Sequence, residues 1–292
     1  MSETEATEAW TIQRVLRWAS DDFAKRGLES ARLDAELLLG RVLSFDRLKL
    51  ILEAHRELTA HELSSFRELI RRRRQHEPIA YILGEREFYG HMFRVDRRVL
   101  IPRPDTETLV EVALARTREA YMYGRALDLC TGSGCVAISL AKARPTWRVL
   151  GTDVSGDALA VARKNAERLG VSFNVGWLLG DLFQALDNNA KFDLIVSNPP
   201  YIPVEEVKEL APDIVNYEPH LALKGGGNGT EILERLIHEA PAHLNAGGTL
   251  AVEIAWNQAP QVSDLFEAAK FTNVRVNKDY GGRDRVVSGV LR

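Results

Sequence analysis

The stretch Asp128-Leu129-Cys130-Thr131-Gly132-Ser133-Gly134 joins an apolar segment, 126–129, to an apolar helical pattern, 136–143. Glycines let a backbone approach a ligand closely, and wound α/β sheets bind ligands at the carboxyl ends of their strands. The stretch therefore predicts a strand, a ligand-binding loop and a helix in succession. Asp153 directly follows the next predicted strand, 149–152, at a position where a carboxylate can bind ribose hydroxyls.

Strand and helix patterns alternate along the chain after this loop. Further strands are predicted at 173–179, 192–196, 249–254, 274–276 and 286–291, and helices at 158–169, 231–244 and 258–269. Such alternation is typical of an open, mostly parallel sheet with helices on both faces. The last two strands are close in sequence and predict a final antiparallel hairpin. The expected fold class is α/β.

The N-terminal region carries a different pattern, in which apolar residues recur at helical spacing. The three apolar faces are formed by Ile12, Val15, Leu16, Ala19 and Phe23, by Leu33, Leu37 and Leu38, and by Leu63, Phe66, Leu69 and Ile70. Gly40 is expected to end the second helix and Pro78 the whole helical region. Thr59 with Glu62 predicts a capping box at the start of the third helix.

Between these regions, 85–101 predicts two short strands. Pro102 and Pro104 then require an extended backbone, since each proline disfavours helical geometry in its predecessor. We therefore expect three parts: a helical bundle at 1–84, a β-hairpin linker at 85–101, and the α/β domain at 102–292.

The composition is that of an ordinary globular protein, 45% hydrophobic and 27% charged, with a net charge of -3. A negative balance argues against nucleic-acid binding through charge alone. Two cysteines, Cys130 and Cys135, cannot form a disulfide framework and indicate a reducing, cytoplasmic location. Met1–Trp10 is acidic and polar, unlike a signal peptide, and no apolar run approaches the ~20 residues of a membrane span.

A run of four arginines, Arg71–Arg74, ends the third predicted helix. Cations at a helix C-terminus complement the macrodipole, so a solvated helix end is one interpretation. Contact with nucleic acid or with an acidic partner is the other. The sequence leaves both open.

The glycine loop fits two cofactors. Gly132-x-Gly134-x-x-Ala137 satisfies the dinucleotide fingerprint, although such a fingerprint can also be a tight turn that packs a helix on a strand. Asp128 favours S-adenosylmethionine over a dinucleotide, because a carboxylate repels a pyrophosphate but attracts the cationic methionine part of S-adenosylmethionine. The loop resembles the first motif of class I methyltransferases, which implies a Rossmann-like, mostly parallel seven-stranded sheet.

The same resemblance implies roles for individual residues. The methionine part of S-adenosylmethionine would be surrounded by Asp128, Cys130, Thr131, Gly132, Ser133 and Gly134. Asp153 would bind the ribose, and Asp181 with Leu182 would flank the adenine. Cys130 stands where the family pattern usually has glycine, so its thiol could alter cofactor affinity.

A second loop, Asn198-Pro199-Pro200-Tyr201, directly follows the predicted strand 192–196. Its two prolines fix an extended backbone and remove two amide donors, so the loop presents acceptors such as the Asn198 side-chain oxygen and the Pro199 carbonyl. Those two acceptors can receive both hydrogens of a planar NH2 group, and Tyr201 offers a ring for stacking. We find no metal-ligand cluster and no nucleophile–histidine pair in the sequence.

This loop resembles the Asn-Pro-Pro-Tyr motif of amino-group methyltransferases, in which Asn198 would also lie beside the cofactor. Three further segments, 77–84, 88–90 and 99–107, resemble the release-factor glutamine methyltransferases over essentially the whole chain. The family implies methylation of the glutamine in the Gly-Gly-Gln motif of class I peptide chain release factors, with a helical N-terminal domain that helps to recognise them. Ala255 stands where glycine is more usual in that family.

Alternatives remain at this point. A close relative methylates a glutamine of a ribosomal protein, although 101–107 resembles the release-factor group more. A DNA adenine methyltransferase would need base flipping and a target-reading region, for which the chain has no extended basic insertion. A noncatalytic module would not require an intact Asn198–Tyr201 loop. We expect a monomer that contacts neither nucleic acid nor membrane directly.

Overall fold

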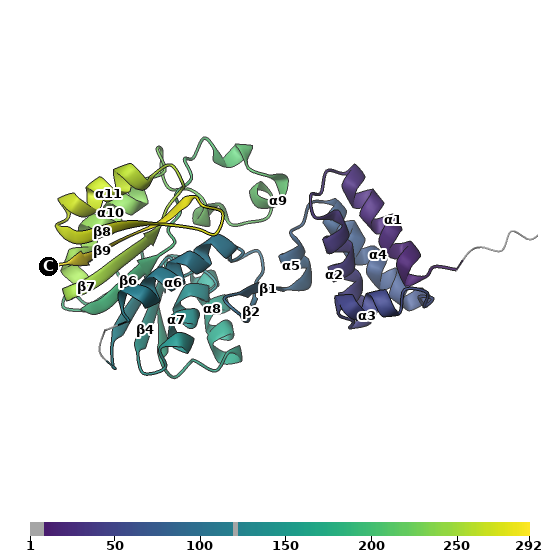
Figure 1. The fold of residues 1–292 in the computed structure, drawn as a ribbon, viewed down its shortest axis with the longest axis horizontal. Helices are drawn as coiled ribbons and strands as arrows, with labels where there is room; N and C mark the ends of the chain where they lie inside the picture. Colours follow the sequence, from purple (N-terminus) through teal and green to yellow (C-terminus); the bar gives the residue numbers. More distant parts are fainter. Residues whose placement is uncertain (1–8, 119–121) are drawn as a thin grey trace, which may run out of the picture. The chain divides into compact units, whose positions relative to one another are not determined.

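The computed structural model describes residues 9–118 and 122–292. The chain divides into two compact units, one that ends at Gly84 and one that runs Glu85–Arg292 (Figure 1). The acidic start that predicts the absence of a signal peptide lies outside the described residues, apart from Ala9 and Trp10. Within the described ranges, no helix is long and apolar enough to cross a membrane.

The first unit is all-helical, as expected. Its helices are α1 (Ile12–Lys25), α2 (Ala31–Leu43), α3 (Arg47–Leu52), α4 (Ala60–Arg74) and α5 (Ile79–Leu83). The predicted capping box is confirmed: the Thr59 hydroxyl accepts from the Glu62 nitrogen, and the Glu62 carboxylate accepts from the Thr59 nitrogen. Most of the predicted apolar residues meet in one core, whose fully buried members include Ile12, Ala19, Phe23, Ala35, Leu38 and Leu39. The prediction is wrong for Leu33, which is 41% exposed; Ala35 and Leu39 join Leu38 on the buried face of α2 instead.

Two expected helix ends are wrong. Helix α2 continues past Gly40 to Leu43, and Ser44 ends it in the left-handed conformation at φ 55°. A Cβ at Gly40 would lie 2.6 Å from the Phe45 carbonyl oxygen, so this glycine makes room for the chain beyond the helix rather than ending it. Pro78 does not end the helical region either; it directly precedes α5, because a proline at a helix start costs no hydrogen bond.

The four arginines of α4 are engaged within their own unit. Arg73 forms a buried ion pair with Asp34, with 2.7 Å between Nε and Oδ2. Arg71 pairs with Glu68 and Arg72 with Glu77, both close in sequence, whereas Arg74 pairs with Asp22 of α1. A solvated helix end is therefore wrong for Arg73, whose side chain is 7% exposed.

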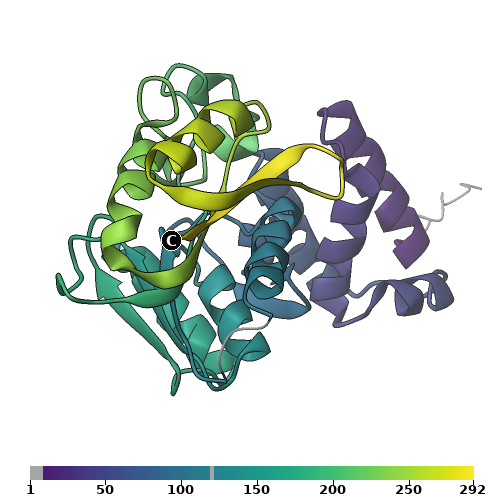
Figure 2. The same ribbon diagram turned by 60° about the vertical axis from the view of Figure 1, so that its left-hand side comes forward.

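The second unit is built on a seven-stranded sheet of order β5-β4-β3-β6-β7-β9-β8. The strands are β3 (Arg125–Leu129), β4 (Arg148–Asp153), β5 (Val175–Leu179), β6 (Phe192–Ser197), β7 (Leu244–Glu253), β8 (Phe271–Lys278) and β9 (Asp284–Leu291). Strands β3 to β7 pair in parallel, whereas β9 is antiparallel to both neighbours. The predicted final hairpin is thus confirmed, and β8 is an edge strand (Figure 2).

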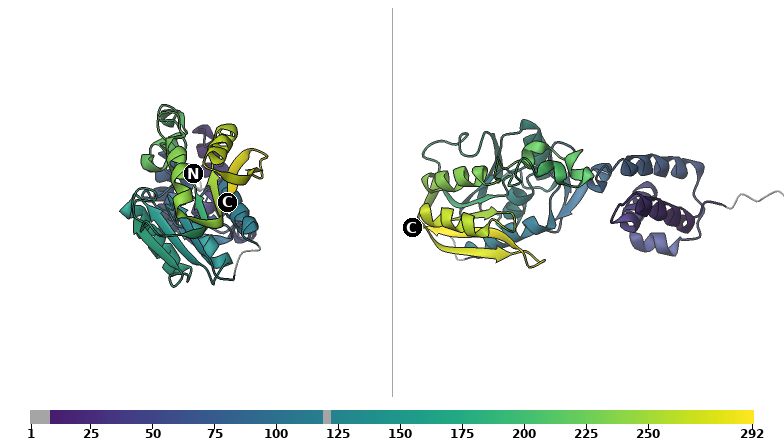
Figure 3. Two further views of the ribbon diagram at one scale, coloured as in Figure 1. Left: turned by 90° about the vertical axis from the view of Figure 1, so that its left-hand side faces the viewer. Right: turned by 90° about the horizontal axis from the view of Figure 1, so that it is seen from above.

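Helices cover both faces of this sheet (Figure 3). One face carries α6 (Glu107–Arg116), α7 (Cys135–Ala143) and α8 (Gly156–Arg168), and the other carries α10 (Glu231–Glu239) and α11 (Ala259–Ala268). Side chains of a strand alternate between faces, and along β3 Ala126 joins the first core while Leu127 and Leu129 join the second. The alternation directs Asp128 toward the face of α7.

Some boundaries differ from those predicted. Strand β7 begins at Leu244 rather than at the predicted 249. The prediction missed this start because Gly247 and Gly248 lie within the strand and weaken the strand pattern in the sequence. The preceding helix ends at Glu239 and continues as the short 3-10 helix η4 (Ala240–His243). Strand β8 is also longer than the expected segment 274–276.

The hairpin of β1 (Glu85–Phe88) and β2 (His91–Arg94) lies within the second unit. The Asn165 side chain of α8 accepts a hydrogen bond from the Arg94 backbone N–H at 2.8 Å and donates one to the Arg94 carbonyl at 3.0 Å. Phe88 and Phe93 are fully buried in the core on that face. The hairpin is thus packed against the sheet domain through both backbone and side chains.

Candidate active site

The loop after β3 has an unusual backbone. Cys130, Gly132 and Gly134 take positive φ angles of 58°, 55° and 80°. A Cβ at Gly134 would lie 2.8 Å from the Trp177 ring, so close packing as well as conformation requires glycine there. At Gly132 a Cβ would meet no atom within 4 Å. The loop is therefore packed against the protein at Gly134 and open at Gly132.

Asp128 fixes this loop through hydrogen bonds. Its Oδ2 accepts the Thr131 hydroxyl at 2.6 Å and the Ala137 nitrogen, at the start of α7, at 3.1 Å. The side chain is almost completely buried, and burial raises the pKa of this carboxyl to about 7. A buried carboxylate of this kind is stabilised by a cationic ligand placed beside it.

Asp153 ends β4 beside the same loop. Its Oδ2 accepts the Gly132 nitrogen and its Oδ1 accepts the Ser155 nitrogen, each at 2.9 Å. Burial raises the pKa of this carboxyl, while the backbone donors oppose the rise. Asp128 and Asp153 thus hold neighbouring parts of the glycine loop, and a carboxylate has further lone pairs with which to accept hydroxyl groups.

Asp181 and Leu182 follow β5. Asp181 is half-exposed and pairs with Arg235 of α10, with 2.7 Å between Oδ2 and Nη2. Leu182 takes a positive φ of 49°, and its side chain is buried in the core. Any contact of Leu182 with a ligand would therefore involve its backbone. Arg235 was not singled out in the sequence, because nothing in the helix pattern of α10 distinguishes it.

The second expected loop leaves the carboxyl end of β6, the strand that pairs with β3. Asn198 donates from Nδ2 to the Thr106 hydroxyl at 3.1 Å, and the Tyr201 hydroxyl donates to Glu253 Oε1 at 3.2 Å. Burial raises the pKa of Tyr201, and the nearby Glu253 charge adds to the rise. The two predicted loops therefore lie at the same edge of the sheet.

A glycine-rich segment supports this loop from behind. A Cβ at Gly225 would lie 2.7 Å from Tyr201 Cα, and one at Gly229 would lie 2.6 Å from the Tyr201 carbonyl oxygen. The Gln258 side chain donates to the Tyr201 and Gly229 carbonyls at 3.2 and 3.3 Å. Gly225 and Gly229 are thus required for close backbone packing, and the run of glycines at 225–229 is the sequence signal of this support.

The segment that follows Tyr201 forms a wall beside the loop. It contains η2 (Val207–Glu209), α9 (Pro212–Val215) and η3 (His220–Ala222), none of which was predicted. Buried Glu218 accepts from the Ile101 nitrogen and pairs with Arg103. A pocket of about 130 Å³ lies here, lined by Leu100, Arg103, Asn198, Pro199, Pro200, Tyr201, Ile202, Leu210, Ile214, Ala222 and Leu223.

The two departures from the family pattern are accommodated. Cys130 is half-buried, and burial raises the pKa of its thiol to about 12, so it stays protonated near neutral pH. The Ala255 backbone N–H donates a hydrogen bond to the Gln258 side-chain oxygen at 2.9 Å. Over the described ranges, His, Cys, Asp and Glu form no group of three or more that could hold a metal ion.

The strand order and the glycine loop at the end of β3 define a class I methyltransferase fold. The catalytic domain of hMettl16, solved with a hairpin of the MAT2A 3′ UTR, shares this fold with a TM-score of 0.58. It is 18% identical and covers 73% of this chain and 80% of its own.

Family models and relatives identify the group more narrowly. Residues 14–84 match the PrmC N-terminal domain and residues 105–228 the methyltransferase small domain. The chain is 43% identical to the release factor glutamine methyltransferase of Geobacter sulfurreducens, over 98% of this chain and 99% of that one. It is 39% identical to that of Rhodopirellula baltica, over 99% of both. The chain belongs to the release factor glutamine methyltransferase family, whose methyl donor is S-adenosylmethionine.

Proposed function

We propose that this chain methylates the side-chain amide nitrogen of the glutamine in the Gly-Gly-Gln motif of class I peptide chain release factors. Release factor glutamine methyltransferases match this chain over nearly its whole length, which supports the assignment of a release factor as the substrate. The observation that carries the chemistry is the position of Asn198–Tyr201 at the end of β6, beside the glycine loop of β3.

The loop residues fit S-adenosylmethionine. The open side of Gly132 leaves space for a ligand, and the buried Asp128 carboxyl favours a cationic one. We assign the methionine part to Asp128 and 130–134, the ribose to Asp153, and the adenine to Asp181 and the Leu182 backbone. The cofactor supplies a methyl group on a positively charged sulfur, which is the electrophile of the reaction.

The residues of the second loop orient the nucleophile. A carboxamide nitrogen is a weak nucleophile, because its lone pair is delocalised into the carbonyl. Asn198 Oδ1 and the Pro199 carbonyl would accept its two N–H groups, which raises electron density on nitrogen and directs it at the methyl group. Tyr201 would stack on the planar amide. Fixing donor and acceptor in line can itself lower the barrier by ~7–11 kcal/mol when the geometry is ideal.

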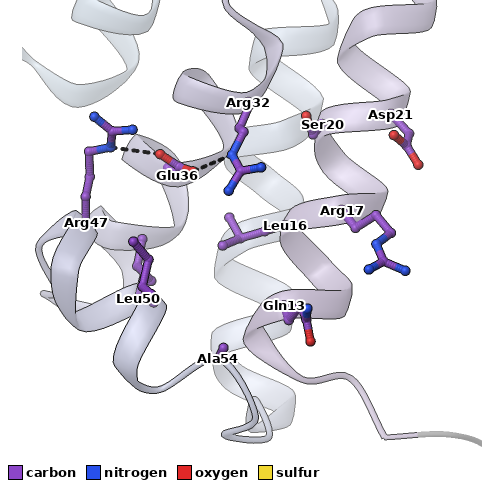
Figure 4. Close-up of a pocket in the computed structure, with 11 residues that line it drawn as sticks. Gln13, Leu16, Arg17, Ser20, Asp21, Arg32, Glu36, Arg47, Leu50 and Ala54 are labelled. Carbon is purple, nitrogen blue, oxygen red and sulfur yellow. Dashed lines mark hydrogen bonds and ion pairs between the residues drawn. The ribbon is translucent and has the colours of Figure 1, made fainter.

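We further propose that the helical unit contributes to release-factor binding. A pocket of about 350 Å³ lies in this unit, with Leu50 and Leu16 at its wall (Figure 4). Arg32 and Arg47 both donate to Glu36 there, at 2.9 and 2.8 Å. Next to it, α3 exposes the large apolar side chains Leu48, Ile51 and Leu52. Exposed apolar patches of this kind mark surfaces that bind other proteins.

The arginine run is assigned no contact with a partner, because each arginine already has a carboxylate partner. The net charge of -3 supports a protein substrate rather than nucleic acid. We also infer that the protein is a cytoplasmic monomer. The two free cysteines support the cytoplasmic location, since thiols stay reduced there.

The substrate is tested with parallel incubations of the protein and radiolabelled S-adenosylmethionine. The acceptors are a class I release factor, its variant with Gly-Gly-Glu, the ribosomal protein that related enzymes modify, and DNA. We expect label in the intact release factor alone. Label in the ribosomal protein or in DNA, without label in the release factor, would assign the chain to one of the alternatives.

The docking surface is tested with Ile51→Glu, which places a charge on the exposed face of α3. KM for the whole release factor should rise while kcat on a short Gly-Gly-Gln peptide stays unchanged. Lys25→Glu, exposed at the end of α1, is the matched control. An unchanged KM for Ile51→Glu would remove α3 from the docking surface.

A further inference from the structure

Arg103 is fixed in place by its neighbours in the sequence and by a buried carboxylate. It lies between Pro102 and Pro104, and its backbone is extended, with φ −97° and ψ 142°. Glu218, whose side chain is 1% exposed, accepts from Arg103 Nη2 on Oε1 and from the Ile101 backbone N–H on Oε2. One buried carboxylate therefore holds both the guanidinium of Arg103 and the backbone that leads to it.

The ion pair uses a single nitrogen of the guanidinium. Over 9–118 and 122–292, Arg103 donates to Glu218 through Nη2 and to no other group. Nε and Nη1 together carry three further N–H groups. The Arg103 side chain is 35% exposed, and neither nitrogen is a buried atom without a partner, so these donors reach solvent.

A buried ion pair of the same unit shows the contrast. Arg285 donates through all three of its nitrogens, from Nε and Nη2 to Asp279 and from Nη1 to the Ile254 carbonyl. Its side chain is 9% exposed. Arg285 thus spends its donors on the fold, whereas Arg103 is held equally well by a buried carboxylate and keeps most of its donors free.

The free donors belong to a residue that lines the pocket of about 130 Å³ at the Asn198–Tyr201 loop. Apart from Asn198 and Tyr201, the other described residues that line this pocket are aliphatic or proline. Arg103 is therefore the one charged side chain among them. A cation with open N–H groups stands beside the loop that we assign to the substrate amide.

The chemistry of the substrate limits what Arg103 can bind there. A Gly-Gly-Gln segment carries no charge, so its acceptors are its backbone carbonyls and the oxygen of the glutamine side chain. A cation on the side-chain oxygen would draw the nitrogen lone pair further into the carbonyl and weaken the nucleophile. A backbone carbonyl is not conjugated with the reacting nitrogen, and glycine has no side chain that could cover its carbonyl.

We infer that Arg103 is a substrate-binding residue, which donates from Nε and Nη1 to backbone carbonyl oxygens of the Gly-Gly-Gln segment while Glu218 holds it in place. The inference rests on the proposed function, because it takes that segment as the substrate. Recognition of the main chain beside the glutamine selects a peptide over a nucleobase, whose amino group has no such carbonyls around it.

The first test is Arg103→Lys. Lysine can keep the ion pair with Glu218, but it lacks the planar fork that binds two partners at once. We expect KM for the release factor to rise by about tenfold, with kcat, the S-adenosylmethionine Kd and the thermal unfolding temperature nearly unchanged. Arg98→Lys is the matched control, since Arg98 is 37% exposed, pairs with Asp96 and does not line the pocket. It should behave as the wild type.

The second test changes the substrate. A Gly-Gly-Gln peptide carries a thioamide at each of its three residues in turn, because sulfur is a weaker acceptor than oxygen. For at least one of these peptides the wild-type KM should rise by about threefold or more, and Arg103→Lys should show no such additional rise. The wild-type measurement does not depend on how well a variant folds.

The outcomes separate this inference from the proposed function. A wild-type KM for the release factor in Arg103→Lys, or a wild-type protein indifferent to every thioamide, overturns the inference alone. A purely structural role for Arg103 would lower the thermal unfolding temperature in Arg103→Lys and leave the thioamide effects as in the wild type. If the peptide is not turned over, KM for the release factor decides. A wild-type protein that methylates neither contradicts the proposed function itself.

Discussion

Asp153 Oδ2 accepts the backbone nitrogen of Gly132 at 2.9 Å, a hydrogen bond that joins the end of β4 to the glycine loop after β3. Because both positions lie at the carboxyl edge of the sheet, one carboxylate can shape the loop and still accept hydroxyl groups of a ligand. The sequence indicated Asp153 as a ribose ligand; the structure adds its contact with the loop backbone.

Asp153→Ala should weaken S-adenosylmethionine binding by about 10- to 100-fold, since a hydrogen bond to a charged group contributes roughly 1.5–3 kcal/mol. Isothermal titration measures the Kd directly. Asp157→Ala, an exposed carboxylate in the first turn of α8, is the matched control and should leave the Kd unchanged. An unchanged Kd in Asp153→Ala would remove this residue from the cofactor site.

Asn198→Ala should abolish methyl transfer while cofactor binding survives. Losing one preorganised hydrogen-bonding group at a reacting centre lowers kcat by about 100- to 1000-fold. Single-turnover kinetics with a release factor and titration with S-adenosylmethionine separate the two effects. Asn189→Ala, at an exposed loop position, serves as control. Normal turnover in Asn198→Ala would contradict its assigned role.

Cofactor affinity should depend on pH through Asp128. Its pKa of about 7 means that the free carboxyl is mostly protonated below that pH, whereas a cationic ligand favours the ionised form. The Kd should therefore fall by about tenfold per unit as pH rises toward 7, and level off above it. Asp128→Asn should remove this pH dependence, and a Kd that is flat with pH in the wild type would contradict the assignment.

The buried pair of Arg73 with Asp34 should be the ion pair of α4 on which the helical unit depends most. Arg73→Met leaves Asp34 buried without its partner, which costs about 3–5 kcal/mol of unfolding free energy. Hydrogen exchange of peptides from α2 and α4, measured in the full chain, reports this locally. Arg71→Met removes an exposed pair and should change exchange little. Equal effects of the two variants would show that burial is not what matters.

Two glycines with positive φ angles should respond differently to alanine. Gly134→Ala adds both backbone strain and a clash with Trp177. It should lower the free energy of unfolding by about 1–3 kcal/mol beyond the effect of strain alone, and it should also weaken cofactor binding. Gly170→Ala has a similar φ of 72° and open space around its Cβ position. It should show only the strain of a left-handed residue, about 1–2 kcal/mol. Thermal unfolding of both variants makes the comparison.

The sequence predicted the elements of the second unit because its strands and helices keep clean periods and end in recognisable loops. Strand β3, helix α7 and the final hairpin agree with the predicted elements within a few residues. Strand β7 did not, since its glycines at 247 and 248 resemble a turn, and the pairing of β6 with β7 is irregular there: Phe192 pairs with Leu244 and Leu194 with Thr249.

The sequence located the loops of the site but not their supports. Thr106 follows two prolines, and Glu253 lies in a predicted apolar strand; only the fold brings Thr106 to Asn198 and Glu253 to Tyr201. Arg235 reaches Asp181 across 54 positions, a contact that no local pattern encodes. Contacts between distant segments depend on the packing of the sheet and cannot be obtained from spacing.

The most direct measurement is tandem mass spectrometry of a class I release factor after incubation with this protein and S-adenosylmethionine. The account predicts one added methyl group, located on the side-chain amide of the glutamine in Gly-Gly-Gln, and none after incubation with Asn198→Ala. A release factor that stays unmodified, or that carries its methyl group on another residue, would contradict it.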